Sequence, residues 1–321
     1  MKFAWLLAVF ALGIWLMPAL GQELSNQNPQ LEKVLWDVDQ QWLCSGPYQK
    51  PFKDCVAFRT HYWPDQFFEV VQTGDLLDKP QMVATQTGQI PSNPPPGEAP
   101  YPDAFRLRAV YGDFAMATDI TSFKTLDSHG RLVFTSDAKV LRLFVKQDGE
   151  WRPAAAGLVP FVPPANHALG DYMNTAREKT GMAGTKSPNG ALERQLAEID
   201  RRWMDSSDMN KRVAYVARLF TSRWFEILGW DPTGNITKLT TVTLLARLAG
   251  NRKAGSVVAD QFQLHAVYGD VALASDRRTR TWTNAKGEAA KTQYRTLLVF
   301  VKKNGEWRSA GGALVPIMEG Q

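Results

Sequence analysis

The chain has 321 residues, a hydrophobic fraction of 44% and a formal net charge of +5. This length corresponds to about two domains, and the hydrophobic fraction suffices for ordinary cores. The basic excess lies in the second half, because residues 31–164 hold 13 basic and 16 acidic residues and residues 192–321 hold 20 and 13. The basic residues form no tail or stripe, which argues against nucleic acid as a partner and favours docking of the two halves.

The N-terminus has the pattern of a secretory signal peptide. Met1-Lys2 precedes an apolar run from Phe3 to Met17, and Ala19 and Gly21 supply the small residues of a cleavage site. A transmembrane anchor is the alternative, but the run is shorter than the roughly 20 residues that a spanning helix needs. We therefore expect residues 1–21 to be removed and the mature chain to be periplasmic or secreted, without membrane attachment.

The two cysteines, Cys44 and Cys55, are close in the sequence. In an oxidising compartment such a pair is expected to form one local disulfide. The alternative is a metal clip, but no histidine lies beside either cysteine to complete a ligand set. We expect the disulfide, and neither a metal nor a cofactor.

Three blocks of sequence occur twice, in the same order and at nearly constant spacing. The first is a pattern of Leu, Asp and Trp at helical spacing. The second is an almost identical Ala-Val-Tyr-Gly-Asp segment, and the third is a Phe-Val-Lys segment followed by Gly-Glu-Trp-Arg and Leu-Val-Pro. Their first occurrences begin at Leu31, Ala109 and Leu143, and their second at Leu192, Ala266 and Val299. The chain is therefore expected to contain two copies of one domain.

Each block predicts a local structure. Apolar residues at helical spacing in the first block indicate an amphipathic helix. Asp148-Gly149 and Asn304-Gly305 in the third block are typical of tight two-residue hairpin turns. Tyr111-Gly112-Asp113 and its counterpart predict a second turn between antiparallel strands. Helices followed by strands indicate an α+β fold with the helices on one face of a curved sheet.

These observations give the domain organisation. We expect a first domain at 22–164, a linker at 165–191 with a short helix around 171–179, and a second domain at 192–321. The proline-rich segment from Pro91 to Pro102 occurs only in the first copy and is a candidate lid.

The ordered combination of the three blocks resembles the nuclear transport factor 2-like superfamily, and its SnoaL-like branch of small bacterial exported domains in particular. The resemblance covers nearly all of both copies. It implies two cone-shaped α+β domains, each with helices that close a strongly bent antiparallel sheet around a pocket, and units that often pair through their sheets. It does not settle function, because relatives include isomerases, cyclases and dehydratases as well as proteins that only bind or assemble.

Ten residues at positions shared by the copies are candidates to line such a pocket: Asp39, Trp42, Glu69, Tyr111, Asp119, Asp200, Trp203, Glu226, Tyr268 and Asp276. The catalytic residues of the isomerase and cyclase relatives cannot be placed on either copy.

The two helical aspartates, Asp39 and Asp200, are expected on the helix face that meets the sheet. Such an acid could act as a base, but its occurrence in both copies favours a scaffold role in which it is hydrogen-bonded to loop amides. The glutamates of the set follow a phenylalanine on a predicted second helix, where a solvated face is favoured over the pocket.

The sequence determines the orientation of the candidate residues on strands less well than that of the helical ones. Strand phase alone does not decide whether Asp119 and Asp276 point inward, where an acid would be notable. The tyrosines are expected to cap the core with their hydroxyl groups in water. The four histidines do not recur between the copies, and hydrolase, metalloprotease and phosphate-loop motifs are absent from the sequence.

Three functions follow as hypotheses. The first is the binding of a small ligand in a cone-shaped pocket. The second is an isomerase, dehydratase or cyclase-like enzyme that uses a pocket aspartate as base. The third is a structural role in which the two copies dock on each other, or two chains form a homodimer.

Overall fold

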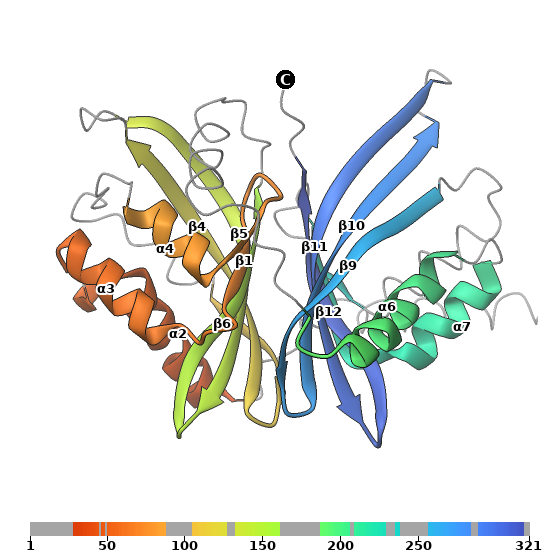
Figure 1. The fold of residues 1–321 in the computed structure, drawn as a ribbon, viewed down its shortest axis with the longest axis horizontal. Helices are drawn as coiled ribbons and strands as arrows, with labels where there is room; N and C mark the ends of the chain where they lie inside the picture. The colour runs from red at the N-terminus through yellow and green to blue at the C-terminus, as the bar shows by residue number, and fades with distance from the viewer. Residues whose placement is uncertain are drawn as a thin grey trace, which may run out of the picture.

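The computed structural model describes residues 28–44, 46–48, 50–87, 105–126, 132–160, 187–205, 209–228, 235–237, 256–283 and 288–317. The segments expected to be a signal peptide, a lid at Pro91 to Pro102 and a linker helix at 171–179 lie outside these residues. The described residues up to Pro160 are called unit one, and those from Ser187 onward are called unit two. Figure 1 shows the two units side by side, with their sheets in the middle and their helices on the outside.

The first helix of each unit starts where the sequence supplies a capping group. Helix α2 (Pro29–Leu43) begins after Asn28, whose side chain accepts a hydrogen bond of 2.9 Å from the backbone N–H of Leu31. Helix α6 (Gly190–Asp205) follows Asn189, which accepts from the N–H of Leu192 at 3.0 Å. The other helices are α3 (Phe52–Tyr62), α4 (Lys79–Thr87) and α7 (Met209–Leu219), with a short 3-10 turn η2 at Gly46–Tyr48.

The strands of both units follow one plan. Unit one contains β1 (Phe68–Val70), β2 (Leu76–Asp78), β3 (Arg106–Tyr111), β4 (Phe114–Leu126), β5 (Leu132–Gln147) and β6 (Glu150–Pro160). Unit two contains β7 (Phe220–Leu228), β8 (Asn235–Thr237), β9 (Ser256–Tyr268), β10 (Val271–Thr283), β11 (Ala289–Lys303) and β12 (Glu306–Pro316).

The two sheets have the same strand order. In the described residues it is β2-β1-β6-β5-β4-β3 in unit one and β8-β7-β12-β11-β10-β9 in unit two. The predicted α+β fold with two separate sheets is confirmed. The sheets differ from the expected purely antiparallel arrangement in one respect, since β1 pairs with β6, and β7 with β12, in parallel.

The predicted hairpin turns are confirmed. Asp148 and Gly149 both have positive φ angles, 52° and 84°, and so do Asn304 and Gly305, at 52° and 81°. Two consecutive residues with positive φ are what a tight turn between twisted strands requires. The Tyr-Gly-Asp turns join β3 to β4 and β9 to β10. All four turns lie at the same end of the molecule (Figure 1).

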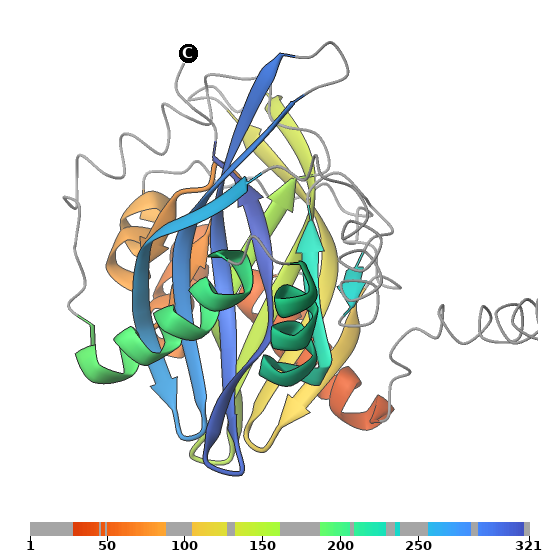
Figure 2. The same cartoon turned by 90° about the vertical axis from the view of Figure 1, so that its right-hand side faces the viewer.

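One face of each sheet packs against the other sheet. Alternate residues of both units form a shared buried cluster that includes Phe68, Leu143, Phe225 and Leu297. The opposite faces carry the helices, and Figure 2 shows α6 and α7 across the outer face of the second sheet. This is the docking of the two units that the sequence favoured. Association of two whole chains stays a prediction.

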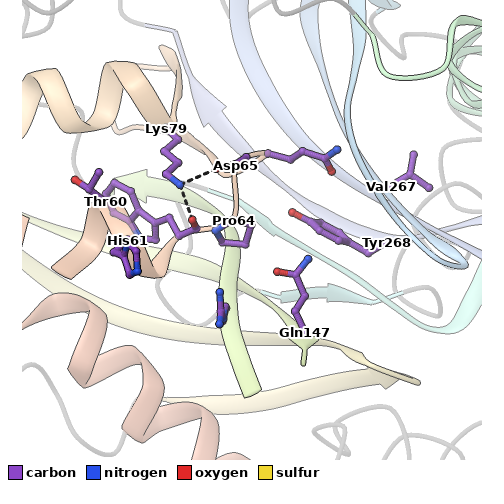
Figure 3. Close-up of a pocket in the computed structure, with 11 residues that line it drawn as sticks. Thr60, His61, Pro64, Asp65, Lys79, Gln147, Val267 and Tyr268 are labelled. Atoms are coloured by element: carbon purple, nitrogen blue, oxygen red, sulfur yellow. Dashed lines mark hydrogen bonds and ion pairs between the residues drawn. The ribbon is translucent and has the colours of Figure 1, made fainter. Parts of the chain in front are cut away.

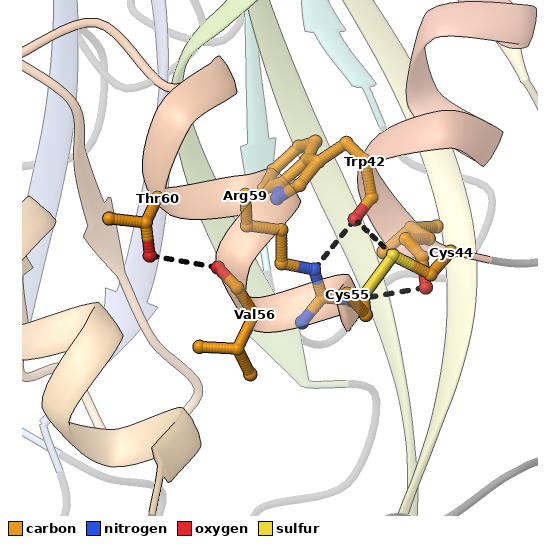
Figure 4. Close-up of a disulfide and its surroundings, with 7 residues drawn as sticks. Trp42, Cys44, Cys55, Val56, Arg59 and Thr60 are labelled. Carbon is orange, nitrogen blue, oxygen red and sulfur yellow. Dashed lines mark hydrogen bonds between the residues drawn. A yellow bond between two sulfur atoms is a disulfide. The ribbon is translucent and has the colours of Figure 1, made fainter. Parts of the chain in front are cut away.

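The expected disulfide is present. Cys44 and Cys55 are joined, with their Cα atoms 6.0 Å apart, and the bond ties the end of α2 to α3 (Figure 4). Beside it, Arg59 donates hydrogen bonds to the carbonyl oxygens of Trp42 at 2.7 Å and Leu43 at 3.0 Å. These carbonyls would otherwise be unsatisfied at the helix end. The disulfide and Arg59 together tie the C-terminal end of α2 to α3.

The prediction for the two glutamates was wrong. Glu69 lies on β1 and Glu226 on β7, not on a second helix, and both side chains are buried. The second helices, α3 and α7, end before these residues. A short strand next to aromatic residues cannot be told from a helix by apolar spacing alone.

Candidate functional site

A buried arginine stands at the centre of three carboxylates in unit two. Arg278 on β10 lies 2.9 Å from Asp200 on α6, 3.0 Å from Asp276 on β10 and 3.4 Å from Glu226 on β7. All four side chains are at most 10% exposed. One helix and two strands of the sheet each contribute one acid, so the centre fixes α6 against the face of the sheet that the helices cover.

Unit one has a related centre built on a different strand. Arg142 on β5 lies with its Nε atom 3.0 Å from Asp39 Oδ1, and its Nη2 atom is 3.9 Å from Asp119 Oδ2. The guanidinium group also lies 4.6 Å from the centre of the Trp42 ring, in a cation–π contact. Glu69 is also buried, and the charges of Arg142 and Arg59 both act to lower its pKa.

Burial dominates the electrostatics of the carboxyl groups. It raises the pKa of Asp39 to about 7, although Arg142 acts in the opposite direction. It likewise raises the pKa of Glu69 and of Glu226 to about 7 against the attraction of the neighbouring arginines. Burial alone would lower the pKa of Arg278, but the combined charges of Asp276, Asp200 and Glu226 outweigh it and raise that pKa.

The two helical aspartates differ in how their oxygens are satisfied. Asp200 Oδ1 accepts a hydrogen bond from Arg278. Asp39 is fully buried, yet neither of its carboxylate oxygens has a hydrogen-bond partner among the described residues, because its contact with Arg142 is an ion pair without hydrogen-bond alignment. A buried acceptor without an aligned donor costs free energy, and the ion pair with Arg142 offsets part of that cost at Asp39.

Each unit brings its two candidate aspartates together beside one arginine. Asp39 and Asp200 face the sheet, as expected, and pair with arginine side chains, where loop amides were expected as partners. Asp119 and Asp276 both point inward under the helices, because they alternate along their strands with the residues of the shared cluster between the sheets. In unit two, then, the two aspartates and the glutamate surround Arg278, and in unit one the two aspartates lie beside Arg142.

The aromatic candidates lie in different places. Trp42 is buried beside Arg142, whereas the side chain of Trp203 lies outside the described residues. Tyr111 and Tyr268 were expected to hold their hydroxyl groups in water, and that prediction was wrong. The Tyr111 hydroxyl is 3.1 Å from Thr221 Oγ1 of unit two, and the Tyr268 hydroxyl is shielded from solvent without a hydrogen-bond partner in the described structure. Both tyrosines lie at the junction of the units, not in a cone.

Sequence comparison of the two copies missed both arginines. Arg142 and Arg278 have no counterpart at the equivalent position of the other copy, so they do not appear in the repeated blocks. A signal was present nevertheless. Arg278 lies two residues after Asp276, on the same face of the strand, and Arg142 interrupts an apolar run. A charged residue in such a strand needs a buried partner.

Two cavities lie where the units meet. The first, about 580 Å³, is bounded by side chains of the 60–66 segment and Lys79 of unit one and by Val267 and Tyr268 of unit two. Figure 3 shows Tyr268 across from Pro64, with Lys79 donating to Asp65 at 3.0 Å and to the Trp63 carbonyl at 2.7 Å. The second, about 990 Å³, lies among the hairpin ends of both sheets. Tyr268 lines both cavities.

The described part of the chain was also compared with the requirements of a metal cluster and of a membrane-spanning helix. No group of three or more His, Cys, Asp or Glu side chains is placed there to hold a metal ion. None of the described helices has both the length and the apolar character required to cross a membrane.

The comparisons with known proteins concern single units. No family model matches the sequence, and no curated protein matches it. Among solved structures, Aln2 from a Streptomyces species is 17% identical, with a TM-score of 0.33, over 41% of this chain and 94% of that one. The association domain of C. elegans CaMKII is 16% identical, with a TM-score of 0.33, over 39% and 95%.

A third solved structure carries a family name in its description. It is an NTF2-like protein from Cytophaga hutchinsonii, 15% identical, with a TM-score of 0.32, over 40% of this chain and 99% of that one. Similarity at this level does not extend to activity or ligand.

Proposed function

We propose that the chain binds a small ligand in the cone-shaped interior of unit one, where Asp39 accepts hydrogen bonds from the ligand. The observation that carries this proposal is the difference between Asp39 and Asp200. The second is engaged by its arginine, while the first is fully buried without a donor in the described structure. A ligand with hydroxyl or amine groups would supply that donor.

The surroundings of Asp39 support such a ligand. Trp42 offers an aromatic surface, and Arg142 prevents the carboxylate from being an isolated buried charge. Unit one also carries the disulfide next to this helix, which holds the ligand-facing residues in place. Sites of this kind combine a mostly apolar wall with a few oriented polar groups.

Saturation-transfer NMR of the full chain with a panel of small alcohols, phenols and amines tests the proposal. Compounds that bind the wild type should lose most of their signal with the Asp39→Asn variant and keep it with Asp200→Asn, the equivalent change in unit two. Circular dichroism first establishes that both variants are folded. A panel without any binder, or equal binding by both variants, would refute the assignment of the site.

An acid–base enzyme is the second candidate. The observation in its favour is that the pKa of Asp39 and of Glu69 is raised to about 7, which suits a general base at neutral pH. Asp200 and Asp276 fit that role less well, because Arg278 holds both. Isomerase or dehydratase chemistry predicts that the chain catalyses exchange of a ligand C–H with deuterated water and that Asp39→Asn abolishes it. Binding of a ligand without exchange would exclude this chemistry and leave ligand binding as the proposed function.

We also propose that the chain is exported with residues 1–21 removed, and that domains at 22–164 and 192–321 are joined by a linker at 165–191. The disulfide supports export, since such bonds persist in oxidising compartments. Mass spectrometry of the exported protein should give Gln22 as the first residue, and limited proteolysis should cut first in the linker. Retention of residue 1, or a first cut inside a sheet, would contradict these boundaries.

A further inference from the structure

The larger junction cavity, here called the hairpin groove, lies outside both cones. It is formed by the Tyr-Gly-Asp turns of the two units, the last residues of β5 and β11, the start of β7 and Arg308 on β12. Its volume of about 990 Å³ is at the upper end of what small-molecule sites offer. Both units contribute to it, so the groove exists only because the sheets are docked.

The charges of the groove are unbalanced. Its lining includes five basic residues and two acidic ones, which are Lys146, Arg223, Lys302, Lys303, Arg308, Asp113 and Asp270. Arg142 and Arg278 in the two buried centres are matched by carboxylates, and Arg308 in the groove is paired with Glu306 at 3.3 Å. Lys146, Lys302 and Lys303 are exposed, and within the described residues no carboxylate lies within ion-pair distance of them. An excess of positive charge in a concavity attracts anions from solution.

Two of the positive charges form a pair that follows from the repeat. Lys146 and Lys302 occupy equivalent positions, and the backbone N–H of each donates at 2.7 Å to the carbonyl oxygen of the equivalent aspartate, Asp113 or Asp270. The two lysines therefore start from matching backbone positions on the two sides of the groove. A ligand with two acidic groups could be held from both sides at once.

The floor of the groove suits an apolar or aromatic body. Valine and phenylalanine side chains from both units line it, including Phe114 and Phe220, together with the rings of Tyr111 and Tyr268.

We propose that the hairpin groove binds an organic anion, with an apolar or aromatic body and two or more acidic groups, between the lysines of the two units. This site goes beyond the proposed function, because Asp39, Trp42 and Arg142 are not among the residues that line it. Its ligand differs in kind as well, since the groove selects negative charge and the Asp39 site selects hydrogen-bond donors.

Isothermal titration calorimetry of the full chain with naphthalene disulfonate tests this proposal. We expect one binding site per chain, an affinity that falls as salt concentration rises, and much weaker binding of the neutral dihydroxynaphthalene. The double variant Lys146→Gln/Lys302→Gln should bind the disulfonate about tenfold less tightly, as expected for the loss of two exposed charge contacts.

The matched control removes two exposed lysines that do not line the groove, in the double variant Lys33→Gln/Lys291→Gln. It has the same net charge as the groove variant and should change the affinity less than about twofold. Thermal midpoints of both variants show that they are folded. An absence of binding, equal weakening by the two double variants, or equally tight binding of dihydroxynaphthalene would each overturn the proposal.

Discussion

Arg142 and Arg278 lie on different strands of their units, yet each is paired with two aspartates at equivalent positions. One aspartate of each pair lies on the first helix of its unit, α2 or α6, and the other lies on β4 or β10. Arg142 is on β5, opposite Ala117, whereas Arg278 is on β10, the counterpart of β4. The position equivalent to Arg142 in unit two is Leu298, and the position equivalent to Arg278 in unit one is Thr121. The two copies therefore share a buried arginine paired with two aspartates, although the arginine lies on a different strand in each copy.

Removal of Arg278 should destabilise the chain strongly. Arg278→Met would leave three buried carboxylates without their counter-charge, and breaking a buried pair by removing one partner costs about 3–5 kcal/mol. Arg308→Met removes an exposed pair with Glu306 and should cost less than about 1 kcal/mol. Urea unfolding of both variants measures the difference. Equal losses of unfolding free energy in the two variants would show that the buried Arg278 centre contributes no more to stability than an exposed ion pair.

The relocation of the arginine can be tested directly. The double variant Arg278→Thr/Leu298→Arg places the arginine of unit two on β11, as unit one has it on β5. It should recover part of the stability that Arg278→Thr alone loses, because the guanidinium group again lies near Asp200 and Asp276. Urea midpoints that are no higher for the double variant than for the single one would contradict the equivalence of the two centres.

Glu69 makes the stability depend on pH. Its pKa is about 7 when folded and near its ordinary value when unfolded, so the folded chain holds a proton that the unfolded chain releases between about pH 4.5 and 7. The free energy of unfolding that this proton contributes is present at low pH and is lost as pH rises towards 7. The full effect is at most about 3 kcal/mol.

A comparison of variants isolates that contribution, because His265 works in the opposite direction. Burial lowers the pKa of His265 to about 3, which reduces stability as pH falls below about 6.5. Relative to the wild type, Glu69→Gln should therefore gain stability between pH 5 and 8, as measured by urea unfolding at several pH values. The exposed Glu150→Gln should show no such trend. A Glu69→Gln difference independent of pH would mean that Glu69 is ionised throughout.

The disulfide should contribute about 3 kcal/mol to stability, as the closure of a loop of this length predicts. Cys44→Ala/Cys55→Ala should lower the free energy of unfolding by that amount, and a reducing agent should lower it similarly in the wild type. The double variant itself should not respond to the reducing agent. Any response there would show that the agent acts elsewhere.

The close packing of the two sheets sets a limit at Gly157 on β6. A Cβ atom at this position would lie 2.9 Å from the Cβ of Ala313 on β12, so Gly157→Val should force the units apart and cost about 2–3 kcal/mol. Gly190→Ala, where the nearest neighbouring atom is 4.0 Å away, should change stability by less than about 0.5 kcal/mol. If chemical denaturation shows Gly157→Val to be as stable as wild type, the sheets are not in direct contact.

Local patterns determine much of this fold. The repeated blocks, the Asp-Gly and Asn-Gly turns and the cysteine pair all act over short distances, and the structure contains the features that they predict. The prediction that Glu69 lies on a helix was wrong because a strand of three residues is too short to show an alternating pattern in the sequence. The periodicity of β5 does not reveal which acids surround Arg142, because Asp39, Glu69 and Asp119 come from three separate elements.

The candidate site was predictable only in part. Asp39 and Asp200 could be assigned to the helix face that meets the sheet, since their spacing from neighbouring apolar residues fixes that face. The role of Arg142 and Arg278 depends on tertiary contacts, and comparing the copies hides it because each arginine stands where the other copy has a different residue. The hairpin groove likewise arises from the docking of two units and has no sequence signature of its own.

The most direct test of the proposed site is a high-resolution crystal structure of the full chain soaked with a compound that passes the NMR screen. We predict an interior space in unit one, bounded by Asp39, Trp42 and Arg142, with a donor atom of the compound within hydrogen-bond distance of an Asp39 oxygen. A cone filled by the chain's own side chains, with one of them donating to Asp39, would contradict it.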